Sequence, residues 1–153
     1  MMLSKEEKEL LRKDLCARLP YGVKAKVLNE DILHYDYSSK EGGFIKGIES
    51  INDGLFVIKC RKDGYVLSYD EFKPYLFPLS SMTEEQKEEL KQEHIKDEKL
   101  YVECLTRAAK GDSSMRGKVI IHYAMDWCNA NHFDYRGLIE KGLAIDATGL
   151  NVY

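Results

Sequence analysis

The feature that most constrains the fold is a run of short, turn-punctuated segments over residues 22–69. Val23, Ala25 and Val27 alternate with lysines, which is the two-residue period of a half-buried strand. Further strands are predicted over 32–37, 44–51, 55–60 and 65–69. Two tripeptides between them favour tight hairpins, Asn52-Asp53-Gly54 and Lys62-Asp63-Gly64. Closely spaced short strands of this kind predict a five-stranded antiparallel SH3-like small β-barrel.

A helix is predicted to precede the barrel. Ser4 and Glu7 have the spacing of a capping box, in which each side chain binds the other residue's backbone N–H. Leucines recur at helical spacing until Pro20, which cannot continue a helix. After the barrel, residues 70–73 are expected to form a single helical or 3₁₀ turn. Residues 74–78 begin and end with proline, which cannot donate to a ladder, so we expect this segment to seal one end of the barrel and not to form a regular strand.

The rest of the chain predicts helices. Thr83 and Gln86 form a second capping box at the start of a highly charged helix. The clearest amphipathic pattern in the chain lies over 119–127. Asp134 is expected to begin a last helix, with Gly142 just past its end.

These elements predict an α+β protein in two parts, a helix with the barrel over 1–81 and a helical lobe over 82–153, either separate or as one compact domain. The chain has 153 residues, 44% of them hydrophobic, and a formal charge of −3, so it can build a core and does not resemble a disordered chain. No apolar stretch approaches the roughly 18 residues of a membrane span, and the N-terminus lacks a secretory signal pattern. We therefore expect a cytoplasmic protein with reduced, half-buried cysteines, Cys16, Cys60, Cys104 and Cys128.

Polar and aromatic side chains concentrate between Trp127 and Ile139. The candidate binding residues of this segment are Trp127, His132, Asp134, Tyr135 and Arg136. Amide, imidazole, carboxylate, phenol and guanidinium groups so close together are typical of a ligand pocket. They are equally typical of a structural corner between two helices, and the sequence leaves both interpretations open.

Tyrosines are frequent in the predicted barrel. Tyr35 and Tyr37 share one face of a predicted strand, because side chains alternate along a strand. A tyrosine ring is apolar and its hydroxyl is wet, which suits surfaces that recognise peptides or stacked bases. Tyr35 and Tyr37 are therefore candidate binding residues.

Catalytic motifs are absent from the sequence. There is no phosphate-binding glycine fingerprint, no P-loop, no nucleophile elbow and no His-Glu-x-x-His pair. His122 with Asp126 and Cys128 with His132 have i, i+4 spacing, but the two pairs point about 120° apart on an ideal helix. We therefore predict no catalytic residues, no metal and no cofactor.

Three segments resemble an uncharacterised family of small proteins from gut bacteria and their prophages: Asp14–Lys24, Phe72–Thr83 and His132–Leu143. The resemblance covers both ends and the centre of the chain. It implies no reaction, cofactor or catalytic residue. It does imply a context, since mobile elements often carry small proteins that bind and modify host or rival machinery.

The favoured function is non-enzymatic binding of a protein partner. One alternative is nucleic-acid binding through a basic side of the barrel formed by Lys24, Lys26, Lys46 and Lys59. The acidic net charge argues weakly against it, because phosphate binding needs a basic face. A second alternative is a small metal-dependent enzyme that uses His122, Asp126 and His132. The sequence leaves open the partner's identity and the oligomeric state.

Overall fold

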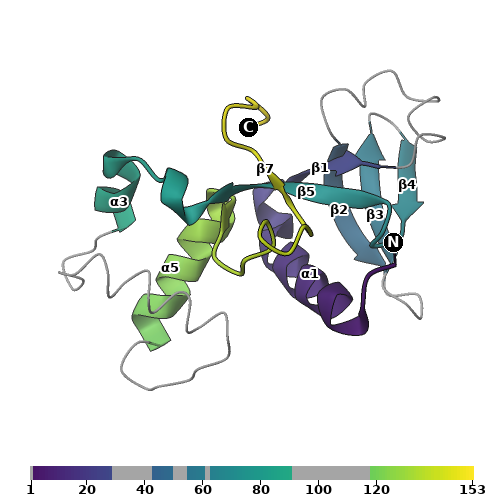
Figure 1. Cartoon of the computed structure of the whole chain (residues 1–153), viewed down its shortest axis with the longest axis horizontal. Helices are drawn as coiled ribbons and strands as arrows, with labels where there is room; N and C mark the ends of the chain where they lie inside the picture. The colour runs from purple at the N-terminus through teal and green to yellow at the C-terminus, as the bar shows by residue number, and fades with distance from the viewer. Residues whose placement is uncertain (1, 29–42, 50–54, 61–62, 91–117) are drawn as a thin grey trace.

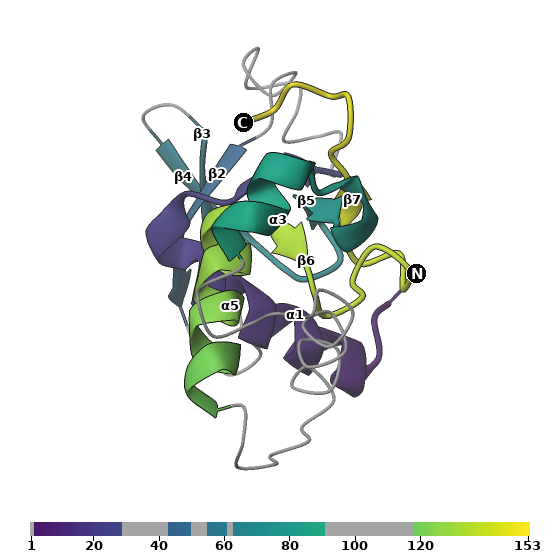
Figure 2. The same ribbon diagram turned by 90° about the vertical axis from the view of Figure 1, so that its left-hand side faces the viewer.

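The computed structural model describes residues 2–28, 43–49, 55–60, 63–90 and 118–153; within them, the side chains of 43–66 and 118–123 are not described. The predicted α+β class is confirmed (Figure 1). An N-terminal helix and a second long helix lie next to each other below a long central strand, which runs from the other long strands on the right of Figure 1 toward a short third helix on the left (Figures 1 and 2). The predicted strand over 32–37, with Tyr35 and Tyr37, lies outside the described residues.

Helix α1 spans Lys5–Arg18 and begins as the sequence predicts. The Glu7 amide donates to Ser4 Oγ at 3.2 Å, and the Ser4 amide donates to Glu7 Oε2 at 2.7 Å. Each bond satisfies an amide that the first turn of a helix leaves without a partner. Pro20 converts the end of the helix into a 3₁₀ turn, η1 (Leu19–Tyr21). Gly22 then reverses the chain at a φ of +68°, a conformation that glycine adopts without steric cost.

The strands form an open, mixed sheet in the order β4-β3-β2-β1-β5-β6, with β7 also paired to β5. The strands are β1 (Lys24–Val27), β2 (Gly43–Glu49), β3 (Leu55–Cys60), β4 (Asp63–Leu67), β5 (Phe72–Pro78), β6 (Phe133–Asp134) and β7 (Ile145–Asp146). Strands β1 to β5 pair antiparallel, as expected for hairpin-linked strands, whereas β6 and β7 join β5 in parallel. Among the described residues β4 and β5 do not pair, so a closed five-stranded barrel is not shown.

The prediction that residues 74–78 cannot form a ladder strand is wrong, and so is the helical turn predicted over 70–73, because β5 already begins at Phe72. Strand β5 pairs with β1, and Pro74 lies opposite Ala25 in this ladder. Phe72, Pro74 and Leu76 are buried while the residues between them are half-buried, which is the two-residue period of a strand. Proline is compatible with a strand wherever its nitrogen is not needed as a donor, and Pro78 is the last residue of β5.

The C-terminal half confirms two predicted helices and contradicts the third. Helix α3 spans Glu84–Leu90 and has the predicted Thr83–Gln86 capping box. Helix α5, Lys118–Ala130, contains the predicted amphipathic segment. No helix starts at Asp134: β6 ends there, and residues 137–142 form turns before β7. Gly137 has a φ of +73°, which a right-handed helix does not contain.

Two clusters of buried side chains hold these elements together. The first lies between α1, the sheet and the C-terminal turn, residues 134–144, and contains Leu11, Leu15, Val23, Leu67, Phe72, Leu76, Leu138 and Leu143 among others. The second surrounds α5 and contains Met82, Leu90, Ala124, Cys128, Phe133 and Tyr135. Burying one such leucine or phenylalanine contributes about 2 kcal/mol. The first cluster draws residues from both 1–81 and 82–153, because the C-terminal turn returns to the sheet.

None of the described helices has the length and apolar character needed to cross a bilayer.

Candidate functional site

The buried face of α1 carries an acid and a base among its leucines. Leu11, Asp14, Leu15 and Arg18 follow the i, i+3, i+4, i+7 pattern of a core-facing helix stripe, and all four are buried. Asp14 and Arg18 have no exposed surface. A charged side chain is buried this completely only when it is paired, so these two residues mark a built site.

Arg18 joins three elements through its guanidinium group. Its Nε and Nη2 bind the two oxygens of Asp14 at 2.7 and 3.0 Å. Nη1 donates to the Cys128 carbonyl at 3.2 Å, and Nη2 donates to the Phe133 carbonyl at 2.7 Å. The Cys128 carbonyl lies in the last turn of α5, where carbonyls lack helical partners and a cation is favoured. Burial opposes the charge, yet Asp14 raises the pKa of Arg18 above its ordinary value.

A second arginine approaches the same carboxylate from the C-terminal turn. Arg136 Nε lies 3.3 Å from Asp14 Oδ1. Arg136 Nη2 donates to the Tyr135 hydroxyl at 2.9 Å, and that hydroxyl donates to Asn129 Oδ1 at 3.2 Å. The Tyr135 ring has the carbon of each guanidinium within 6 Å of its centre, Arg136 at 4.8 Å and Arg18 at 5.7 Å. We call Asp14, Arg18, Tyr135 and Arg136 the buried charge network.

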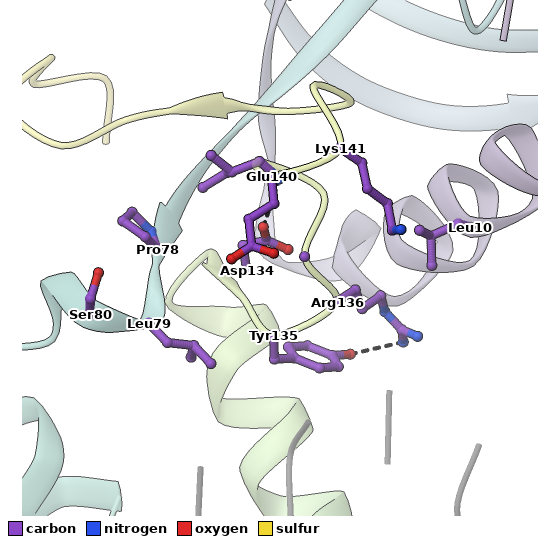
Figure 3. A pocket seen from close by; sticks show the side chains of 11 residues that line it. Leu10, Pro78, Leu79, Ser80, Asp134, Tyr135, Arg136, Glu140 and Lys141 are labelled. Atoms are coloured by element: carbon purple, nitrogen blue, oxygen red, sulfur yellow. Dashed lines mark hydrogen bonds between the residues drawn. The ribbon is translucent and has the colours of Figure 1, made fainter. Parts of the chain in front are cut away.

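A cleft of about 570 Å³ opens beside this network (Figure 3). Its apolar wall comes from α1, from the end of β5 and from the C-terminal turn: Leu10, Pro78, Leu79 and Ile139. Its polar lining comes from Ser80 and from the C-terminal turn: Asp134, Tyr135, Arg136, Glu140 and Lys141. In Figure 3, the side chains of Arg136 and Lys141 lie on the side of Leu10, and Ser80 lies at the opposite end.

Asp134 shapes the turn that carries the charged side chains of the cleft. Its two carboxylate oxygens accept the Leu138 amide at 3.0 Å and the Ile139 amide at 2.8 Å. The sequence predicts that the Asp134 carboxylate accepts backbone amides at the start of a helix. It does accept two backbone amides, but they belong to a turn and not to a helix. Asp134 is itself buried, so its position is fixed from within the fold.

The structure places the sequence-predicted binding residues in two groups. Asp134, Tyr135 and Arg136 line the cleft. Trp127 and His132 do not: the Trp127 ring is stacked on Phe133 at 5.6 Å, and the His132 ring is stacked on Tyr153 at 3.8 Å. Trp127 and Phe133 are packed together, as the corner interpretation expects, but the second helix of that corner does not form. Part of the same segment lines the cleft.

His132 forms a second polar site with the end of the chain. The Tyr153 hydroxyl accepts from the Lys24 amide at 3.1 Å and donates to the Tyr75 carbonyl at 2.7 Å, and the Lys24 ammonium donates to the Val152 carbonyl. His132 is buried, and its Nδ1 has no hydrogen-bond partner in the described part of the chain. Burial, together with the cations Arg18 and Lys24, lowers the pKa of His132 to about 4. The imidazole is therefore neutral at pH 7.

The side chains suggested for the alternative functions are described only in part. Lys24 is held by Val152, Lys26 is exposed, and the side chains of Lys46 and Lys59 lie outside the described residues. Asp126 is exposed on α5 while His132 is buried, and the His122 side chain is not described. Among the described residues no three His, Cys, Asp or Glu side chains gather as metal ligands do.

The two cysteines whose side chains are described are free thiols, and neither is half-buried as predicted. Cys16 is exposed, because it lies on the outer face of α1. Cys128 is completely buried, and burial raises its pKa to about 12. Cys128 is therefore protonated at neutral pH and is a poor nucleophile.

Sequence reasoning missed the two residues at the centre of the network, Asp14 and Arg18. An acid and a base at i, i+4, in register with Leu11 and Leu15, were the available signal. The same spacing is common on exposed helix faces, so the signal does not reveal burial by itself.

Comparison with known proteins yields no match: no family model, no curated protein and no solved structure matches this chain.

Proposed function

We propose that the protein is a non-enzymatic protein-binding module and that the cleft beside the buried charge network is its contact surface. The observation that carries the proposal is the cleft, which combines an apolar wall with charged side chains held on a rigid turn. Interfaces depend on a few anchor side chains that fill pockets of this kind. The size and mixed lining of the cleft suit one or two side chains of a partner protein.

The chemistry of the polar groups supports binding over catalysis. Both oxygens of Asp14 are bound by Arg18, and both oxygens of Asp134 accept backbone amides, so each carboxylate already has partners within the fold. A general base works best with a pKa near the operating pH. The pKa of His132 is about 4 and that of Cys128 is about 12, both far from neutrality.

The SH3-like small barrel belongs to the same proposal. The described strands that pair antiparallel in the order β4-β3-β2-β1-β5 support it, since small barrels are built from antiparallel strands of this number. Small barrels are common scaffolds for peptide recognition, and this is fold-level analogy only.

The test is capture of a partner by the tagged full chain from a lysate of the source organism, with and without nuclease. Ser80 is exposed and lines the cleft, so Ser80→Trp should fill the cleft without removing a buried contact. The matched control is Glu89→Trp, at an exposed position of α3 outside the cleft. We expect a discrete partner that survives nuclease, is retained by the control and is lost from Ser80→Trp.

Two results would contradict this function. Loss of the partner on nuclease treatment would favour the nucleic-acid alternative. Equal retention by Ser80→Trp and by the wild-type chain would exclude the cleft as the contact surface.

A further inference from the structure

The Asp14 carboxylate lies next to two guanidinium groups, those of Arg18 and Arg136, beside the cleft. Arg18 donates hydrogen bonds to both oxygens of Asp14, so it forms the stronger of the two interactions with this carboxylate. Arg136 is left with a 3.3 Å approach to Oδ1, and its buried Nε–H has no hydrogen-bond partner among the described residues. Arg136 is therefore only partly neutralised by the protein.

Arg136 is nevertheless held in one place. Its Nη2 binds the Tyr135 hydroxyl, its guanidinium lies over the Tyr135 ring, and its side chain is only 13% exposed. Its Nη1 makes no hydrogen bond within the described part of the chain. A guanidinium fixed in this way has already lost its conformational entropy on folding. Binding a ligand through its remaining N–H donors therefore does not incur that entropic cost.

A second cation lies on the same side of the cleft. Lys141 is exposed, it lines the cleft, and its ammonium forms no ion pair with the side chains that the structure describes. In Figure 3 its side chain extends to the side where Arg136 and Leu10 lie. Leu10 and Ile139 are partly buried and supply apolar surface beside the two cations.

We infer that this end of the cleft recognises an acidic side chain, Asp or Glu, of the partner protein, with an aliphatic residue beside it against Leu10 and Ile139. The inference rests on the proposed function and names the chemistry of its partner. A carboxylate matches the planar fork of a guanidinium and complements the positive charge of Lys141. The aliphatic neighbour gains burial against the apolar wall.

The two acids that line the cleft affect this recognition differently. Asp134 already accepts two backbone hydrogen bonds and is buried, so its charge is satisfied from within. Glu140 is exposed and forms no ion pair with a described side chain, so it repels an incoming carboxylate. Removing the charge of Glu140 should therefore strengthen binding of an acidic ligand.

The test is an NMR titration of the ¹⁵N-labelled full chain with two tripeptides, N-acetyl-Leu-Glu-Leu-amide and N-acetyl-Leu-Gln-Leu-amide. The two probes differ only in the charge of the central side chain. We expect the Glu peptide to bind at least about tenfold more tightly, since a hydrogen bond to a charged partner contributes roughly 1.5 to 3 kcal/mol. The shifts should concentrate on the amides of 135–141.

Variants at exposed positions keep the test independent of folding. Lys141→Ala should weaken binding of the Glu peptide by about two- to fivefold, and Glu140→Gln should strengthen it by a similar factor, as expected for exposed charge pairs. Neither change should alter binding of the Gln peptide. Lys26→Ala, at an exposed lysine outside the cleft, is the matched control and should leave both affinities unchanged. Arg136→Lys keeps the charge but loses the fork, so it should bind the Glu peptide more weakly than the wild-type chain does.

Equal affinity for the two peptides, shifts confined to residues outside the cleft, or no shifts with either peptide would each overturn the inference. The proposed function is tested separately by capture of the partner. If Ser80→Trp still abolishes capture while the peptides show no preference for charge, the cleft binds a protein by other chemistry. If the Glu peptide binds as expected and capture is insensitive to Ser80→Trp, the cleft recognises carboxylates but is not the contact surface for the partner.

Discussion

Each of the two faces of helix α1 carries an ion pair. The two pairs have almost the same geometry but differ greatly in their expected contribution to stability. On the outer face, Arg12 lies 2.7 Å from Glu9, and the two side chains are 44% and 45% exposed. On the inner face, Arg18 lies 2.7 Å from Asp14, and neither side chain is exposed at all. Both pairs are Arg–carboxylate contacts within one turn of the helix. The comparison shows that the N–O distance of an ion pair does not by itself indicate how much the pair contributes to stability.

Burial makes the difference because it removes the alternative partner, water. If Arg12 loses Glu9, water solvates both groups, so the net gain from the contact is small. If Arg18 is lost, a buried carboxylate and two buried carbonyls lose donors that water cannot replace. The inner pair also ties α1 to α5 and β6, whereas the outer pair joins residues of a single helix.

The largest expected effect follows from removing the inner arginine. Arg18→Ala should lower the free energy of unfolding by about 3 to 5 kcal/mol, the usual cost of breaking a buried pair from one side. Urea unfolding followed by far-UV circular dichroism measures this loss. A change below 1 kcal/mol would mean that water or Arg136 replaces Arg18 at Asp14, and the contrast between the two faces would fail.

An intermediate effect is expected from His132, a buried polar group with no oppositely charged partner among the described residues. Its folded pKa of about 4 lies below the ordinary value of 6.5, so the unfolded chain takes up a proton first as the pH falls. The stability is therefore unaffected above pH 6.5 and falls between about pH 6.5 and 4, and the loss reaches about 2.5 kcal/mol at pH 4.5. Unfolding in urea at pH 7.5 and 4.5, for the wild-type chain and His132→Asn, measures it.

His132→Asn is the appropriate variant because residue 132 has a φ of +61°, a conformation that asparagine tolerates better than most residues. Contributions of carboxyl groups are common to both chains and cancel in the difference. The variant should lose less stability on acidification than the wild-type chain. An equal loss would show that His132 titrates normally in the folded state and is not shielded from water.

The smallest effect is expected on the outer face. Arg12→Ala should leave the urea midpoint unchanged within error, because the pair that it breaks is exposed and screened. The Glu9 carboxyl, whose pKa is lowered mainly by its hydrogen bond to Arg12, should return toward its ordinary pKa, and an NMR pH titration of its side chain measures this change. A midpoint shift as large as that of Arg18→Ala would contradict the comparison.

Local signals predicted the elements whose causes are local. The capping boxes at Ser4 and Thr83, the amphipathic α5 and the alternation of β1 all depend on residues within a few positions of one another. The misassigned segments depend on distant partners. Strand β5 forms because β1, β6 and β7 pair with it, although Pro74 and Pro78 discourage a strand locally.

The candidate site divides in the same way. Sequence clustering was enough to select Asp134, Tyr135 and Arg136, which line the cleft. It could not separate them from Trp127 and His132, since all five lie within ten residues of one another and differ only in what packs against them. The contact between Asp14 and Arg136 could not be predicted, because the two residues are more than a hundred positions apart along the chain.

By itself the sequence determined the α+β class and the start of each capped helix, since these depend on short-range hydrogen bonds and on the period of apolar residues. Only the tertiary structure decided that the Asp14–Arg18 pair is the buried one and the Glu9–Arg12 pair the exposed one. The two pairs have nearly the same spacing and chemistry in the sequence. What separates them is exclusion of water, which arises when α5, β6 and the C-terminal turn close over one face of α1.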